Sequence, residues 1–127
     1  MMWLTFDEGS GNIAYDYSGN GNNGTLYNGT NICGGIDTCP LWVDEKIGKA
    51  VSFDGVDDYV DAGNDTSLQL NGDLTISAWI YADFPLTDEH RNLIAKWHWA
   101  EFGLEITYGY VRLDQGNVTN YEATWSN

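Results

Sequence analysis

Oxygen-bearing side chains alternate along a Gly-rich stretch near the start of this sequence. Asp16, Ser18 and Asn20 stand at alternate positions, as the first ligands of an EF-hand calcium loop do. An EF-hand would also need flanking helices and a Glu at its twelfth position, where this chain has Tyr27. The spacing argues against an EF-hand. Two interpretations of these residues stay open. They form a looser cation site built from the oxygens of two loops, or they are turn residues that hydrogen-bond to their own backbone.

Carboxylates crowd into residues 48–63, GKAVSFDGVDDYVDAG, the stretch around which we expect the chain to be organised. Its acidic residues are Asp54, Asp57, Asp58 and Asp61. Asp54-Gly55 tolerates the left-handed backbone angles of a tight reversal, and the flanking residues alternate in polarity. This pattern predicts two short strands folded about an acidic turn. The like charges repel one another unless solvent, backbone N–H groups or a cation offsets them.

Two indole rings and an imidazole follow one another at Trp97, His98 and Trp99. Sugars present apolar faces to aromatic rings and hydroxyls to polar groups, and recognition residues usually lie on loops of a rigid scaffold. These three residues are therefore the glycan-binding candidates. The alternative is that one or both Trp side chains close the end of the core.

Glycoside hydrolysis is the sharpest catalytic alternative, because a retaining glycosidase needs two carboxylates about 5 Å apart. Glu101 and Glu105 share a strand face only if the strand begins early, and position 103 between them is not acidic. His90 and His98 form no H-E-x-x-H motif, and the sequence has no G-x-S-x-G elbow. We therefore predict no catalytic residues in this chain and interpret the two Glu as solvated strand charges.

The balance of acidic and basic residues excludes some classes of binding partner. The chain has 127 residues, of which five are basic and nineteen acidic, for a net charge of −14. Such a surface repels nucleic acid and anionic membranes, so we expect a glycan or an extracellular protein as partner, besides other domains of a parent chain. No apolar run reaches the roughly 18 to 20 residues of a membrane helix. The opening resembles no signal peptide, and we expect a domain cut from a longer protein.

The two cysteines, Cys33 and Cys39, enclose a Gly-rich loop of five residues. They could close a small disulfide or stay free thiols, whereas a zinc site would need four ligands. We favour the disulfide, which implies an oxidising compartment and an extracellular or cell-surface location. The cysteines fall within residues 28–47, which we expect to be a long irregular insertion.

Alternation of period two dominates the remaining chain and predicts an all-β fold. The strongest strand pattern is LTISAWIY at residues 74–81, with aliphatic side chains on one face and large rings on the other. Further strands are expected at 3–6, 50–53, 59–62, 93–96, 102–107, 110–113 and 121–125. Short strands separated by Gly-rich turns, with no helical periodicity, predict an antiparallel two-sheet sandwich.

Several stretches, in this order, resemble the laminin-G-like, concanavalin-A-like jelly-roll modules. They are WLTFDEGSGN from Trp3, D-x-S-G-N-G-N-x-G from Asp16 and GKAVSFDGVDDYV from Gly48. The resemblance spans most of residues 3–113 and implies one jelly-roll domain over residues 1–127. Because the family continues with further strands, it also implies that this jelly roll is incomplete at its C-terminal end.

The resemblance also implies a structural calcium ion near the loops. The candidate ligands are Asp16, Asn20 and Asn22, with Asp58 or Asp61 completing the shell. The predicted function is that of a non-catalytic carbohydrate- or protein-binding module, active in adhesion, within a larger secreted or surface protein. Two alternatives stay open, because fold alone does not decide function: an accessory domain of a polysaccharide-active glycoside hydrolase, or a structural spacer.

Overall fold

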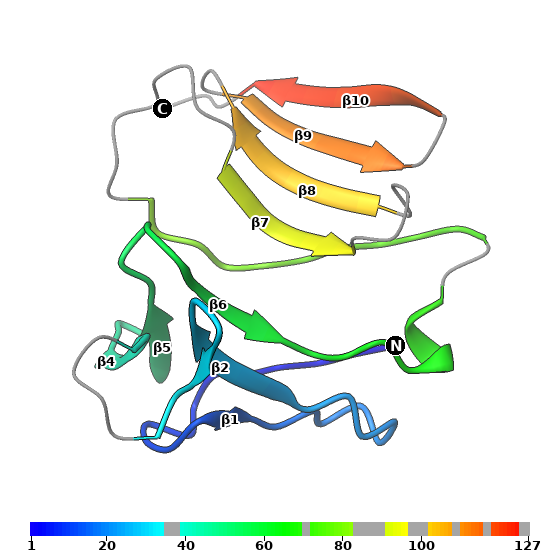
Figure 1. Ribbon diagram of the computed structural model, residues 1–127. Coiled ribbons are helices and arrows are strands. Elements are labelled where there is room, and N and C mark those ends of the chain that lie inside the picture. Colours follow the sequence, from blue (N-terminus) through cyan, green and yellow to red (C-terminus); the bar gives the residue numbers. More distant parts are fainter. Residues whose placement is uncertain are drawn as a thin grey trace. The chain divides into compact units, whose positions relative to one another are not determined.

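The computed structural model describes residues 1–34, 39–69, 72–82, 91–96, 102–107, 110–115 and 118–124. The chain divides into two compact units, a first unit of Met1–Asn71 and a second unit of Gly72–Asn127 (Figure 1). Apart from one 3-10 turn, η1 (Thr66–Leu68), the regular elements of the described residues are antiparallel strands. The predicted all-β class is confirmed, and its strand content fits a β-sandwich. In the described part of the chain, no helix has the length and apolar character to cross a membrane.

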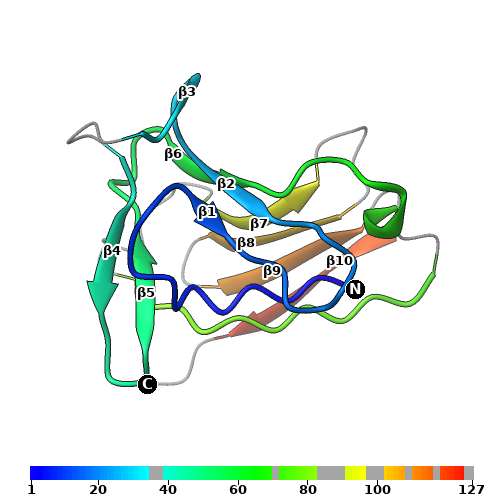
Figure 2. The same cartoon turned by 90° about the horizontal axis from the view of Figure 1, so that it is seen from below.

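The first unit is built around strand β2 (Gly24–Asn28), which pairs on both of its edges. Thr25 has Ile13 of β1 (Ile13–Ala14) on one side and an Asp of β6 (Asp58–Asp61) on the other. Tyr27 likewise lies between β3 (Asn31–Ile32) and β6. Because a strand residue has one neighbour on each edge, β1 and β3 share one edge of β2 and β6 takes the other. These four strands are labelled in Figure 2.

A separate hairpin joins β4 (Leu41–Asp44) to β5 (Lys49–Ser52). Gly48 closes its turn in the left-handed region at φ 69°, which a glycine adopts without steric cost. Two expectations are corrected here. Residues 28–47 are not wholly irregular, because they contain β3 and β4. The two strands on either side of the acidic turn do not pair with each other, because β5 pairs with β4 and β6 pairs with β2.

The core of the first unit lies on one face of β2. Its buried members are Ala14, Leu26 and Cys33, and the side chains packed against them are Leu4, Phe6, Cys39, Trp42, Val51 and Val60. Leu26 and Val60 are direct cross-strand partners, so β2 and β6 turn the same face to the core. The N-terminal segment contributes Leu4 and Phe6 without forming the expected strand, because only Leu4 bridges to another residue, Asp16. The packing of Leu4 and Phe6 against the core therefore helps to hold this segment in place.

The second unit holds a four-stranded antiparallel meander. Its strands, in order across the sheet, are β10 (Val118–Thr124), β9 (Tyr110–Gln115), β8 (Phe102–Thr107) and β7 (Arg91–Lys96) (Figure 1). Ile106 of β8 is fully buried, as its place in the alternating sequence predicts. The strands expected between residues 93 and 125 are thus confirmed, with bounds that differ by a few residues.

The strand expected at residues 74–81 is wrong. Residues 73–82 belong to no strand, and Trp79 and Tyr81 are 101% and 86% exposed. Alternation gives a segment the capacity to form a strand, but a strand also requires a neighbour that completes its backbone hydrogen bonds. No strand of the described residues pairs with this segment. The large rings of Trp79 and Tyr81 therefore face solvent.

Candidate functional site

The Asp16 carboxylate organises the loop that was expected to bind calcium. Its Oδ1 accepts the backbone N–H groups of Trp3 and Ser18, both at 2.9 Å. Its Oδ2 accepts the Ser18 hydroxyl at 2.8 Å and the backbone N–H of Asn22 at 2.9 Å. Four donors thus converge on one side chain. The geometry matches the alternative in which these residues satisfy their own backbone.

The electrostatics of this loop favour a charged Asp16. Partial removal from water raises the pKa of the Asp16 carboxyl, but the hydrogen bonds from Trp3, Ser18 and Asn22 outweigh that effect. Its pKa consequently lies well below the usual range for Asp. The carboxylate acts as a fixed anion that ties the N-terminal segment to the loop, and a cation would have to share oxygens that already accept hydrogen bonds.

The two asparagines of the candidate set are also engaged. Asn20 donates from Nδ2 to the Met1 carbonyl at 2.7 Å and to the Ser18 hydroxyl at 3.1 Å. Asn22 is buried, and its Nδ2 lies 3.0 Å from the hydroxyl of Ser67, which in turn lies 3.3 Å from its Oδ1. Asn22 therefore locks the loop to η1, forty-five residues later in the chain.

The remaining two candidates lie on strand β6. Asp58 pairs with Asn28 at the far end of β2, six residues from Asn22, which corresponds to about 20 Å of extended chain. Asp61 lies opposite Thr25, and its Oδ1 accepts the backbone N–H of Gly63 at 2.8 Å. The structure thus places Asp16, Asn20 and Asn22 in one loop and Asp58 and Asp61 on strand β6.

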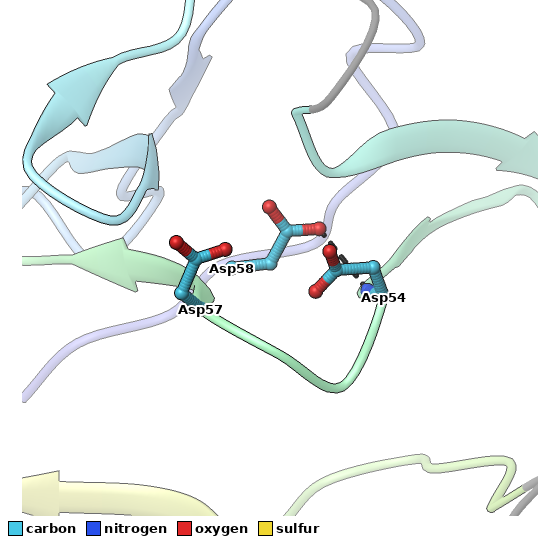
Figure 3. Close-up of side chains that lie close together, drawn as sticks. All are labelled: Asp54, Asp57 and Asp58. Carbon is cyan, nitrogen blue, oxygen red and sulfur yellow. Dashed lines mark hydrogen bonds between the residues drawn. The ribbon is translucent and has the colours of Figure 1, made fainter.

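Three carboxylates do meet at the acidic turn. Oxygen atoms of Asp54, Asp57 and Asp58 all lie within 4.8 Å of one another (Figure 3). Burial raises the pKa of Asp58, as do the charges of Asp54 and Asp57, while hydrogen bonds from the Asp54 N–H and the Asn28 amide partly oppose the shift. The sequence predicts this crowding of carboxylates, but the predicted ligand from this stretch was Asp58 or Asp61. Exposed acidic groups are common without a metal, so the cluster alone does not assign one.

A stacked aromatic pair that was not predicted from the sequence lies on β2 and β6. The rings of Tyr27 and Tyr59 are stacked, with centroids 5.0 Å apart and planes 4° from parallel. Their neighbours Leu26 and Val60 face the core, so the two tyrosines lie on the opposite face of the sheet. The sequence does show that each tyrosine adjoins an aliphatic residue in a short strand-like stretch. It does not show that β2 pairs with β6, and the stacking depends on that pairing.

The predicted disulfide is confirmed between Cys33 and Cys39, with their Cα atoms 5.7 Å apart. It borders a hollow of about 440 Å³. The residues that line the hollow are Gly11, Asn12, Cys33, Gly34, Cys39, Pro40, Leu41 and Trp42. Trp42 donates from Nε1 to the Gly11 carbonyl at 2.9 Å, so the insertion is anchored to the N-terminal loop beside the disulfide.

The glycan-binding candidates Trp97, His98 and Trp99 lie outside the described residues, as do Glu101 and His90. Glu105 is described, and it is 7% exposed. Its Oε1 lies 3.4 Å from Nη1 of Arg112, the residue opposite it on β9. Glu105 is therefore a half of a cross-strand ion pair rather than the solvated strand charge that was expected.

Comparison with known proteins gives one informative likeness. No family model and no curated protein matches the chain. The crystal structure of a fragment of an S-layer domain-containing protein from Clostridium thermocellum resembles it with a TM-score of 0.67 and 25% sequence identity. The match covers 99% of this chain and 58% of that fragment. The likeness therefore spans the described fold, while this chain corresponds to little more than half of the longer fragment.

Proposed function

We propose that this chain is a non-catalytic binding module of a larger secreted or surface protein, of the laminin-G-like, concanavalin-A-like type. The observation that carries the proposal is the likeness, over 99% of the chain, to a fragment of an S-layer domain-containing protein. That protein's name ties the shared fold to the cell surface, although the chain covers only 58% of the fragment. The ligand is a glycan or another extracellular protein.

The disulfide and the charge support the location. A bond between Cys33 and Cys39 persists in an oxidising environment such as the cell exterior. A net charge of −14 keeps a secreted module soluble and away from anionic membranes. Both features agree with an extracellular or cell-surface protein, and neither selects a particular ligand.

The surroundings of Glu105 support a role without bond cleavage. A glycosidase carboxylate works beside a second carboxylate about 5 Å away. Glu105 instead faces the guanidinium of Arg112 at 3.4 Å. A polysaccharide-active enzyme remains the alternative at the level of the parent protein, in which this module would be an accessory domain.

Calcium is part of the proposal as a stabilising ion, with the acidic turn as the place to test. Asp54, Asp57 and Asp58 offer three carboxylates in mutual reach, and oxygen ligands are those that calcium prefers. An ion that binds only the folded form raises the melting temperature with its free concentration. If millimolar calcium leaves the melting temperature of the chelator-treated protein unchanged, the calcium part of the proposal is wrong.

A glycan array, run with and without EDTA, tests the binding function. We expect binding to a subset of glycans and loss of that binding in the Trp97→Ala and Trp99→Ala variants. Binding that EDTA abolishes would connect calcium to recognition. Failure to bind any glycan, together with failure to retain extracellular proteins in a pull-down, would favour the structural spacer instead.

A further inference from the structure

We propose that Asn64 carries an N-linked glycan. This inference rests on the extracellular location in the proposed function, because N-glycosylation modifies chains that leave the cytoplasm. It concerns a covalent modification of the module and goes beyond the ligand that the module binds.

The chain contains four Asn-x-Thr sequons, the acceptor motif of N-glycosylation. They begin at Asn23, Asn28, Asn64 and Asn117. Asn117 lies outside the described residues. The other three lie in the first unit, where their side chains have different hydrogen-bond partners.

Glycan transfer takes place at the side-chain nitrogen of the Asn. A transferase bonds Nδ2 to the anomeric carbon of a sugar that is carried on a lipid phosphate. The bond from that carbon to the phosphate oxygen breaks, the lipid phosphate leaves with the electron pair, and Nδ2 gives up one proton. Nδ2 then holds the sugar and a single N–H donor. The folded unit must therefore leave the Nδ2 side of the carboxamide without a packed partner.

Asn28 fits this requirement poorly. It is the last residue of β2, where it pairs with Asn31 on one edge and with Asp58 on the other. Its Nδ2 donates to Oδ1 of Asp58 at 3.4 Å. A sugar on Nδ2 would have to displace this contact between β2 and β6.

Asn23 is held by the Asp16 loop. Its Oδ1 accepts the backbone N–H of Asp16 at 2.9 Å. The next residue, Gly24, is buried and begins β2, and Thr25 pairs with neighbours on both edges of that strand. Two of the three residues of this sequon are therefore part of a paired strand, and the carboxamide already positions the loop.

Asn64 meets the requirement. It lies between β6 and η1, outside every strand of the described residues. In the described part of the chain, its side chain has no hydrogen-bond partner. The next residue, Asp65, caps η1 by accepting the Ser67 N–H at 2.8 Å, and the Ser67 hydroxyl contacts the buried Asn22. The backbone at Asn64 is thus anchored, while its carboxamide is not used by the fold.

The hydrogen bonds that distinguish the three sequons all join residues of Met1–Asn71. They are local to the first unit, so the choice of Asn64 does not depend on where the second unit lies. Transfer to a secreted chain can also take place as the chain emerges, before its units have packed.

Peptide mapping by mass spectrometry tests the inference on the protein recovered from the surface or the medium of the cells that produce it. Chymotrypsin cleaves after Leu26 and Tyr27, so it separates Asn23 from Asn28. We expect the peptide that contains Asn64 to carry added sugar mass and the peptide that contains Asn28 to be unmodified.

Variants made in the same cells identify the acceptor. Asn64→Gln removes the acceptor and Thr66→Val removes the hydroxyl of the sequon, so each should lose the sugar mass from this peptide. Thr66→Ser keeps a hydroxyl and should retain the sugar. Asn28→Gln is the matched control and should leave the sugar mass unchanged. Circular dichroism checks that each variant is folded. The Asn64→Gln chain should melt at the same temperature as the deglycosylated original, because the Asn64 side chain makes no hydrogen bond.

Two results would overturn the inference and leave the proposed binding function intact. One is an unmodified Asn64 peptide in protein recovered from the cell surface or the medium, including the case in which Asn23 or Asn28 carries the sugar instead. The other is sugar mass on the Asn64 peptide that survives Thr66→Val. Recovery of the protein from the cytoplasm alone would overturn the proposed function and, with it, the glycan at Asn64.

Discussion

The carboxylate of Asp16 and the backbone N–H of Trp3 are joined by a hydrogen bond of 2.9 Å, across thirteen residues of chain. A hydrogen bond between backbone groups, from the Tyr17 N–H to the Trp3 carbonyl at 2.8 Å, adds to it. The Trp3 and Tyr17 rings meet edge to face at 6.2 Å. These contacts hold in place an N-terminal segment that forms no strand. The Asp16 carboxylate therefore contributes to anchoring this segment, as the hydrogen bonds between paired strands do elsewhere in the fold.

The first prediction concerns that anion. Replacing Asp16 with Asn keeps the shape but leaves one acceptor oxygen for four donors, so we expect the melting temperature to fall by several degrees at neutral pH. Asp73→Asn, which removes the same charge from an exposed position, should leave the melting temperature nearly unchanged. Equal melting temperatures for the two variants would show that the hydrogen bonds of Asp16 contribute nothing to stability.

The second prediction concerns acid. The folded-state pKa of Asp16 lies below the ordinary value of about 3.9, so its stabilisation is complete above that value and is lost as the pH falls further. The pKa of Asp58 is raised, so its ionised form lowers stability at neutral pH and protonation relieves that cost. Urea midpoints measured from neutral pH downward should first rise or stay level and then fall. The fall should be smaller in Asp16→Asn than in the original chain.

The sequence predicts the strands of this fold better than it predicts their partners. The alternating run FGLEIT gives β8 (Phe102–Thr107) with its bounds, because a buried Ile106 between polar neighbours is a local signal. The pairing of β6 with β2 joins residues that are thirty to thirty-six positions apart in the sequence, and no local pattern encodes it. The same limit explains residues 74–81, whose alternation is strong but whose partner is not among the described strands.

In the candidate site, too, local features were predicted from the sequence and contacts between distant segments were not. The pairing of Cys33 with Cys39 follows from short spacing in a loop, and the structure confirms it. The grouping of Asp16 with Asp58 depended on two loops meeting in space, and β2 keeps their surroundings apart by its own length. The stacked pair of Tyr27 and Tyr59 was missed for the same reason, since it exists only once β2 and β6 are adjacent.

The third prediction concerns the acidic turn. Asp57→Asn removes one of the charges that raise the pKa of Asp58, so we expect the free energy of unfolding to increase by about 0.5 kcal/mol at low salt. The gain should shrink at high ionic strength, because exposed charges are screened. It should also disappear at a pH where the carboxyls are protonated. A gain that persists unchanged in both conditions would mean that charge repulsion is not its cause.

The fourth prediction concerns Trp79, which is 101% exposed on the segment that was expected to form a strand. Trp79→Ser should change the free energy of unfolding by no more than about 0.5 kcal/mol, as exposed substitutions usually do. It should also reduce self-association at high protein concentration, because exposed rings promote contacts between molecules. Urea unfolding and light scattering measure the two effects. A loss of 3 kcal/mol or more, typical of a buried Trp at roughly 3–5 kcal/mol, would show that the ring is packed in solution.

The fifth prediction concerns the disulfide that encloses residues 33–39. Closing so short a loop lowers the entropy of the unfolded chain by an amount worth about 2 kcal/mol, so the double variant Cys33→Ser and Cys39→Ser should lose roughly that much stability. A second effect adds to it, because Cys33 is 4% exposed and belongs to the core, where a Ser hydroxyl needs a hydrogen-bond partner. Reduction with dithiothreitol separates the two, since it opens the loop without changing the residue. We therefore expect the reduced chain to be intermediate in stability between the original and the double variant, and equal stability of reduced and oxidised chains would show that the loop constraint contributes nothing.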